Sequence, residues 1–339
     1  LLAISLISCS DSPPPESTQL QVPSEFIIRS LDVLSFETRQ HNLLLQQQLV
    51  QLQKAVNRFV SLPTETTYSE AQRQWIETHL HYVTASTLLM ASDASETQAL
   101  VFHLDAWPIL PGFLDSLPDY PDSGIINDIT VEVIVPVIRE QHGITDPGEV
   151  SLGLHALEYF LWGRQLADFQ GESEAARRRR ALLQIQAAQL LEDSTALIEQ
   201  QKAVQQNLRE ASHDEIMLML LHALDGQLTR SFEEVNLALD AEHAHAYQSG
   251  QVWQTISQRL KGVKALLDSP INLVSILEPL DAEESVLVLE NVSALLEDLD
   301  RQIRQQQDLN SHEVPLRLSM LTHSTEHFLI LANTAKVTE

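Results

Sequence analysis

One helix-like stretch of the sequence combines an imidazole and a carboxylate with otherwise apolar residues. His155 and Glu158 stand three positions apart in the run from Leu154 to Trp162. On an α-helix these positions are neighbours, so both side chains can face a common centre. The apolar surroundings predict burial, and a buried ionisable pair costs free energy unless it is hydrogen-bonded or binds something. The pair is therefore either a structural hydrogen bond or part of a metal or substrate site.

A second pair has the same spacing further along the chain. Glu242 and His245 begin a predicted helix and share one face of it. If this pair faces His155 and Glu158, two imidazoles and two carboxylates form a nitrogen and oxygen ligand set that suits iron or zinc. The alternative is an ordinary solvated helix start.

A third pattern, near the C-terminus, is typical of zinc peptidases. Residues 323–327 match H-x-x-E-H, with His323 and His327 as metal ligands and Glu326 as the base. The chain contains 13 histidines, so a chance match is a real alternative. His79 and His81 are two positions apart on a predicted helix, so their side chains diverge and predict no shared site.

Residues 150–163 read V-S-L-G-L-H-A-L-E-Y-F-L-W-G and resemble the G-x-H-x-x-E signature block of the imelysin family of bacterial periplasmic and surface proteins. The family is associated with iron uptake, and its founding members were described as metallopeptidases. The resemblance therefore implies a functional site at His155 and Glu158.

Two other segments resemble the same family. The Asp-Ala-Trp-Pro run at 105–108 is similar to a family segment that precedes the signature helix, and its prolines predict an irregular cleft wall. Asp105 could reach the site, although a capping or turn role is the commoner fate of such a residue. Glu242 and His243 match an acidic-His block of the family, but the continuation at 246–250 departs from the family pattern. Glu242, His243 and His245 are thus further candidate ligands.

The N-terminus is similar to a bacterial lipoprotein signal that begins inside its apolar core. Residues 6–9 read Leu-Ile-Ser-Cys, as in a lipobox, and a proline-rich tether follows. We expect Cys9 to carry the lipid anchor, and Ser10 favours the outer membrane. The protein is then a periplasm-facing or surface lipoprotein of the bacterial cell envelope.

Composition indicates an all-α protein. Only 10 of 339 residues are glycine, 44% are hydrophobic, and long Pro-free runs keep helical spacing. The net charge of −26 argues against binding nucleic acid. The spacing predicts helices over 24–62, 69–91, 153–163, 177–211, 214–239, 240–267, 281–307 and 314–335. Residues 129–135 favour a short strand, and the arginine run at 177–180 predicts a solvated helix face.

These elements predict three parts: a truncated signal peptide and tether over 1–23, a helical bundle over 24–165, and a second bundle over 166–339. The two bundles pack together with the signature helix at their junction, as the resemblance implies. We expect a binding protein for iron, or for zinc, associated with iron uptake and with a transport partner. The alternatives are a zinc metallopeptidase and a partner-recognition scaffold. Because His155 and Glu158 supply two ligands and no evident base, binding is favoured over catalysis.

Overall fold

A computed structural model describes residues 20–87, 95–213 and 244–268, together with isolated residues between 215 and 237 and between 294 and 301, and residues 335–338. Cys9, Glu242, His243, His323, Glu326 and His327 lie outside the described residues, so their predicted roles stay predictions. The described chain is mostly helical, with long turns between some of the helices and one two-stranded parallel sheet. Its elements are β1 (Leu20–Pro23), α1 (Ser24–Ser61), α2 (Glu65–Thr87), α3 (Ser95–Asp105), α4 (Pro111–Leu114), α5 (Val135–Gln141), α6 (Leu154–Trp162), the 3-10 helix η1 (Leu166–Phe169), α7 (Glu174–Leu208), α9 (Val252–Asp268) and β2 (Ala335–Thr338).

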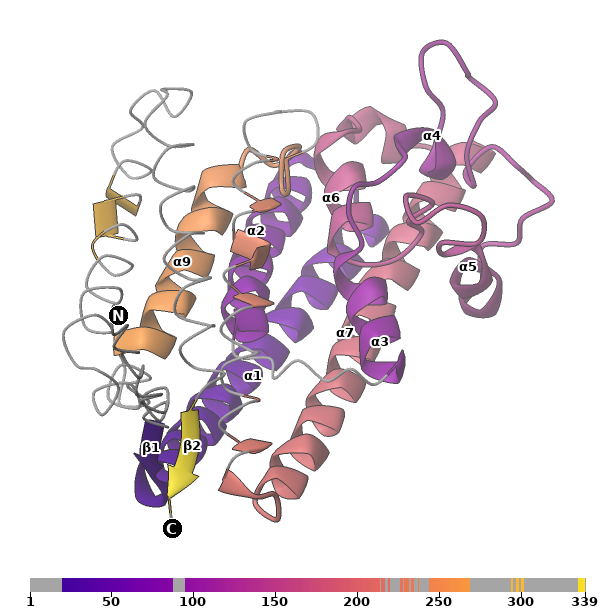
Figure 1. Ribbon diagram of the computed structural model, residues 1–339. Helices are drawn as coiled ribbons and strands as arrows, with labels where there is room; N and C mark the ends of the chain where they lie inside the picture. Colours follow the sequence, from indigo (N-terminus) through magenta and orange to yellow (C-terminus); the bar gives the residue numbers. More distant parts are fainter. Residues whose placement is uncertain are drawn as a thin grey trace, which may run out of the picture.

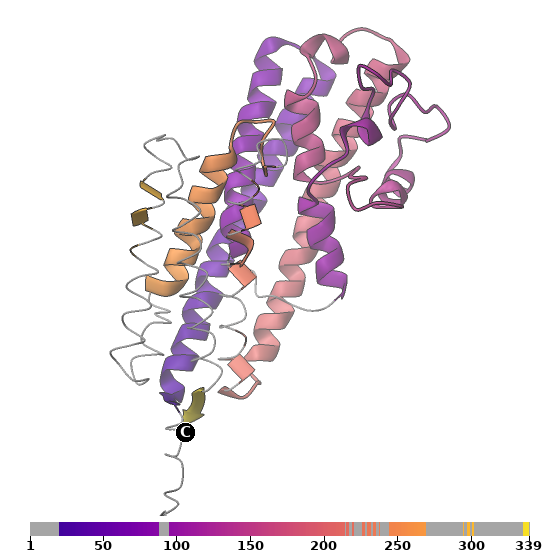
Figure 2. The ribbon, with the colours of Figure 1, turned by 45° about the horizontal axis from the view of Figure 1, so that its top comes forward.

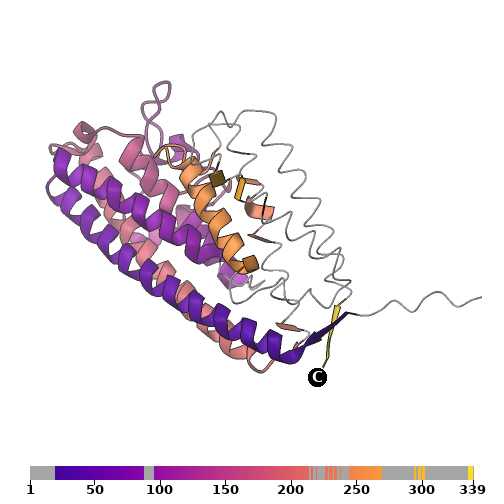
Figure 3. The ribbon, with the colours of Figure 1, turned by 90° about the vertical axis from the view of Figure 1, so that its left-hand side faces the viewer.

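Three long helices form the framework that positions the rest. α1 packs against both α2 and α7, and its core residues recur every three or four positions, as an amphipathic helix requires. Figure 1 shows α1, α2 and α7 running side by side, with α9 beside α2. Figure 2 shows α3 and α6 following one another along α7. In Figure 3 the hairpin of α1 and α2 is seen from the side. The all-α prediction is confirmed.

Several predicted boundaries need correction. The strand predicted over 129–135 is wrong: these residues form turns and bends, and α5 begins at Val135 with Pro136 in its first turn, where a missing N–H costs nothing. The helix predicted over 240–267 begins instead at Val252, because residues 245–250 form consecutive turns. His245 therefore lies on a turn and not on the predicted helix, whereas Glu242 is outside the described residues.

The arginine run differs from the predicted solvated face at its two central positions. Arg178 is buried and donates hydrogen bonds to four backbone carbonyls between residues 125 and 131. Arg179 donates to both carboxylate oxygens of the fully buried Asp115, at 2.6 and 2.9 Å. Through these bonds the two arginines attach the irregular segment after α4 to α7. Arg177, in contrast, forms an exposed ion pair with Glu174.

The predicted division at residue 165 stays a prediction. Contacts cross it in the described part of the chain, because α7 packs on α1, α3 and α6. Among the described residues, no helix combines the length and apolar character needed to span a membrane.

Candidate metal centre

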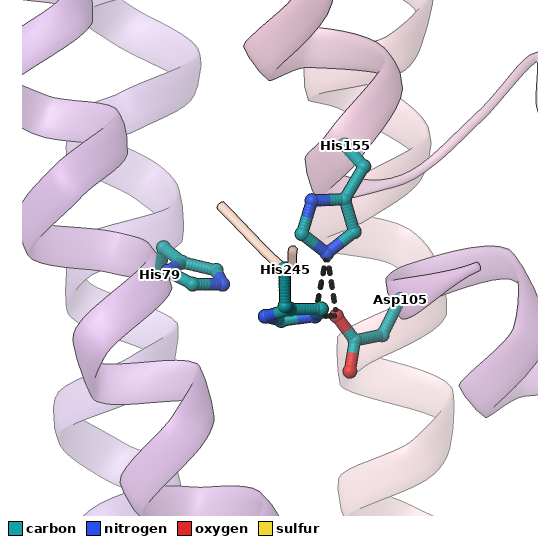
Figure 4. A group of neighbouring side chains, drawn as sticks. All are labelled: His79, Asp105, His155 and His245. Carbon is teal, nitrogen blue, oxygen red and sulfur yellow. Dashed lines mark hydrogen bonds and ion pairs between the residues drawn. The ribbon is translucent and has the colours of Figure 1, made fainter. Parts of the chain in front are cut away.

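Four buried side chains from four separate segments converge beside the signature helix. His79 comes from α2, Asp105 from the last position of α3, His155 from α6, and His245 from the turn before α9. One possible ligand atom of each lies within 4.8 Å of the others. In Figure 4, His79 and Asp105 approach from opposite sides, and His155 points down toward His245 between them. Of these four residues, His155 and His245 were candidate metal ligands in the sequence analysis.

Gly153 explains how α6 approaches the end of α3 closely enough to bring His155 to Asp105. Its φ is 93°, a conformation that favours glycine. A Cβ here would lie 2.6 Å from the carbonyl oxygen of His103 and 2.9 Å from that of Leu104, much closer than real contacts allow. On the other side, the indole N–H of Trp75 donates to the carbonyl of Leu154 at 2.8 Å and ties α2 to the start of α6.

Substitution of Gly153 by alanine should therefore destabilise the protein. Both the positive φ and the clash with α3 oppose a side chain, so we expect a loss of about 2 kcal/mol or more in the free energy of unfolding. Gly171 is a matched control, since its φ of 74° is also positive but no atom lies within 4 Å of the position that a Cβ would occupy. Gly171→Ala should lower the free energy of unfolding, measured by urea denaturation, clearly less than Gly153→Ala does. Equal losses for the two variants would contradict the close-packing argument.

The centre is built around the imidazole of His155. Its Nε2 lies 2.7 Å from Nε2 of His245 and 3.1 Å from Oδ1 of Asp105, which is also 3.2 Å from Nε2 of His245. Its Nδ1 lies 3.0 Å from Oε2 of Glu158, on the side of the ring away from the centre. The other oxygen of Glu158 accepts the backbone N–H of Ser249 at 2.8 Å. Two nitrogens 2.7 Å apart are at hydrogen-bond distance, so one of these two Nε2 atoms carries a hydrogen that faces the other.

Burial and charge set the protonation of this group. Burial by itself lowers the pKa of His155, but hydrogen bonds with Asp105 and Glu158 outweigh it and raise the pKa to about 9. Burial and then the charge of His155 lower the pKa of His245. Burial alone would raise the pKa of Asp105, yet Arg230 and His245 hold it well below its usual range. At neutral pH the cluster therefore contains an imidazolium, an ionised carboxylate and a neutral imidazole.

His79 completes the group without a hydrogen bond of its own. It is fully buried, and neither ring nitrogen has a partner among the described residues; the same holds for Nδ1 of His245. Burial, followed by His245 and His155, lowers the pKa of His79 well below its ordinary value, so the ring is neutral. Its ring stacks on Trp75 with centroids 4.7 Å apart, which fixes its orientation. A buried polar group without a partner costs roughly 1–3 kcal/mol, which a bound ligand would offset.

A chain of ion pairs connects to the centre through Asp105. Arg230 pairs with Asp105 through the carboxylate oxygen that does not face the histidines. Arg230 also lies near Glu234, which pairs with the fully buried Arg259 at 2.7 and 2.8 Å. The pairing leaves Oδ1 of Asp105 directed at His155 and His245.

The structure brings together His155, Glu158 and His245 of the predicted site residues. Asp105, for which both a place at the site and a capping or turn role were considered, also lies in the cluster, and so does His79, for which the sequence predicted no site. The divergence of His79 and His81 on α2 excludes a site that uses both residues, but it leaves His79 free to meet partners from other segments. Nothing in the local sequence around His79 signals this role.

Comparisons with known proteins agree with this architecture. The family model described as Imelysin matches residues 38–322. A solved structure described as an iron-regulated protein A precursor from Parabacteroides distasonis has a TM-score of 0.66 at 12% sequence identity, covering 95% of this chain and 96% of that one. An Imelysin-like protein from Psychrobacter arcticum has a TM-score of 0.57 at 13% identity, covering 93% of this chain and 95% of that one. No curated protein matches the chain. The family match spans most of the sequence, so the chain belongs to the Imelysin family.

Proposed function

We propose that this protein binds a divalent metal ion, most suitably ferrous iron, in the cluster formed by His79, Asp105, His155 and His245. The observation that carries the proposal is the convergence of three imidazoles and one carboxylate, all buried, with candidate ligand atoms within 4.8 Å of one another. Imidazole and carboxylate groups together suit iron and other first-row divalent metals.

The contacts give the residues different roles. Nε2 of His155, Nε2 of His245 and Oδ1 of Asp105 already face one point, and they make a set of two histidines and one carboxylate. The unpartnered nitrogens of His79 offer a fourth ligand. Glu158 accepts from the opposite nitrogen of His155, so we assign it an orienting role, which differs from the direct ligation expected from its spacing.

The similarity of this chain to a protein described as iron-regulated, rather than the chemistry of the ligands, favours iron over zinc. The donor set admits both metals, and zinc binds such ligands more tightly than ferrous iron in general. One structural relative is described as iron-regulated, and that description supports iron for this chain.

The peptidase alternative finds no support at this centre. A hydrolytic site must admit a peptide and keep a base near the metal. Each of the four side chains belongs to a residue less than a tenth exposed, and both carboxylate oxygens of Glu158 are already hydrogen-bonded. A base with this arrangement would have to release its partners before it acted.

Metal analysis of protein purified without chelators tests the proposal. We expect close to one equivalent of iron per chain after anaerobic loading with ferrous salt and gel filtration, and a much lower content in His155→Ala. Loading with zinc under the same conditions should also succeed, because the ligands accept it. A His155→Ala protein that folds normally and retains the full wild-type metal content would contradict the proposal.

The cell-envelope location remains a proposal that rests on the lipobox-like sequence ending at Cys9. A lipid-anchored periplasmic or surface position would place this cluster where metal enters the cell.

A further inference from the structure

A cavity lies between α1 and α7, lined by residues other than those of the metal cluster. Its volume is about 490 Å³, within the ordinary range of small-molecule sites. On the α1 side it is lined by Ser35, Arg39, Asn42 and Gln46. These residues are spaced by four, three and four positions, so they lie along one face of the helix.

The facing side of α7 has the same character. Gln201, Lys202, Gln205 and Arg209 line the cavity there, at positions that also share one side of a helix. Where two helices of a bundle pack together, the facing residues are normally apolar. A polar and basic lining at this place is therefore poorly explained by packing.

Two buried polar groups on the wall lack partners. Oγ of Ser35 and Nε2 of Gln201 have no hydrogen-bond partner among the described residues, although both residues are less than a tenth exposed, at 4% and 6%. The amide oxygen of Gln201 is occupied, because it accepts from Asn42 at 2.7 Å. Its amide hydrogens and the serine hydroxyl are thus free to bond a ligand. Leaving such groups unsatisfied costs free energy unless a ligand completes them.

The charged side chains among the described residues that line the cavity are all basic. Arg39, Lys202 and Arg209 contribute three cations, and none of the described lining residues is acidic, in a chain of net charge −26. Lys202 and Arg209 form ion pairs with Glu199 and Asp32, but these are exposed pairs, which hold their partners weakly. Both cations can turn to a ligand without leaving a buried charge behind.

We propose that this cavity binds a small organic polycarboxylate. Arg39, Lys202 and Arg209 would hold its carboxylates at the rim, and Gln201 and Ser35 would hydrogen-bond it at the wall. A single phosphate ion would leave most of the volume unfilled, whereas Leu43 and Ile198 supply apolar surface for a carbon skeleton. The site is independent of the metal proposal, since it shares no lining residue with the metal cluster.

Calorimetric titration with citrate tests the proposal. The protein should first be freed of metal on a chelating resin, because soluble chelators are themselves polycarboxylates. The titration should be done at 0.15 M salt, where the Debye length is about 8 Å, so that repulsion between citrate and the remote acidic surface is largely screened. We expect citrate to bind with one site per chain, and its uncharged trimethyl ester and inorganic phosphate to bind at least about tenfold more weakly, a difference of about 1.4 kcal/mol.

Variants separate this site from other sources of binding. Arg39→Gln with Lys202→Gln should weaken citrate binding at least about tenfold, and Gln201→Glu, which keeps the shape but places a negative charge on the wall, should weaken it further. Arg58→Gln is a matched control on α1, because Arg58 pairs with Glu70 and does not line the cavity. The proposal is overturned if citrate does not bind, if phosphate or the ester binds equally well, if the double variant binds like wild type, or if Arg58→Gln weakens binding as much as the double variant does.

Discussion

Replacing His155 with alanine is expected to weaken ferrous iron binding by roughly a hundredfold or more. Loss of a residue that only orients a ligand typically costs about 10–100-fold in metal affinity, and His155 is proposed to be the ligand itself. Its Nε2 is also the atom that contacts both Oδ1 of Asp105 and Nε2 of His245, so no neighbouring nitrogen can replace it. Anaerobic competition titration against a chromogenic chelator measures the change.

Two histidines of α2 provide a matched pair for the same experiment. His79 lies in the cluster, whereas His81, two positions along the helix, points to another side and is not part of it. His79→Ala should weaken binding, although less than His155→Ala, because the other three ligands remain. His81→Ala should bind like wild type. If His81→Ala and His79→Ala have equal effects, or if folded His155→Ala binds within about threefold of wild type, the metal is held elsewhere.

Metal affinity should rise steeply with pH over a range in which an ordinary histidine would have no effect. The pKa of His155 is raised to about 9 by Asp105 and Glu158, so its proton must leave before the nitrogen can bind a cation. Below that pKa each bound ion displaces one proton, and the affinity should increase about tenfold per pH unit. Between pH 6.5 and 8.5 the expected gain is about a hundredfold. A histidine with an ordinary pKa of about 6.5 would level off at the start of this range.

Glu158→Gln tests the cause of that pH dependence. The amide keeps the shape and an oxygen acceptor for Nδ1 of His155, but it removes one of the two carboxylates that raise the pKa. The pH at which affinity levels off should therefore move to a lower value. Cobalt(II), which accepts similar ligands and resists oxidation, allows the profile to be recorded optically. A profile that is flat above pH 7 in the wild type would show that His155 is not protonated in the metal-free cluster.

Much of the helical framework was predictable, because it depends on local periodicity. The signature helix was expected over 153–163 and is observed over Leu154–Trp162, since apolar residues on every side and a glycine at each end mark it. The break predicted between the helices over 24–62 and 69–91 is likewise observed, since α1 ends at Ser61 and α2 begins at Glu65. The strand over 129–135 failed because β-branched residues were given more weight than Pro136, which opens a helix instead.

The candidate centre was only half predictable. His155 and Glu158 could be paired because they are three residues apart, but Asp105 and His245 reach them across 50 and 90 residues of chain. No local sequence pattern indicates a contact between residues so far apart in the chain. His245 was expected on a helix, whereas the turns at 245–250 direct it to the centre. The buried role of Arg179 was hidden for the same reason, because Asp115 lies 64 residues away.

Anomalous diffraction at the iron absorption edge, from crystals of the full chain grown anaerobically with ferrous iron, would locate the metal. We expect one strong peak per chain, in coordination contact with Nε2 of His155, Nε2 of His245 and Oδ1 of Asp105. Glu158 should remain on the far side of His155. A peak at His323 and His327 with none at His155, or no peak in crystals that contain the intact cluster, would contradict the proposal.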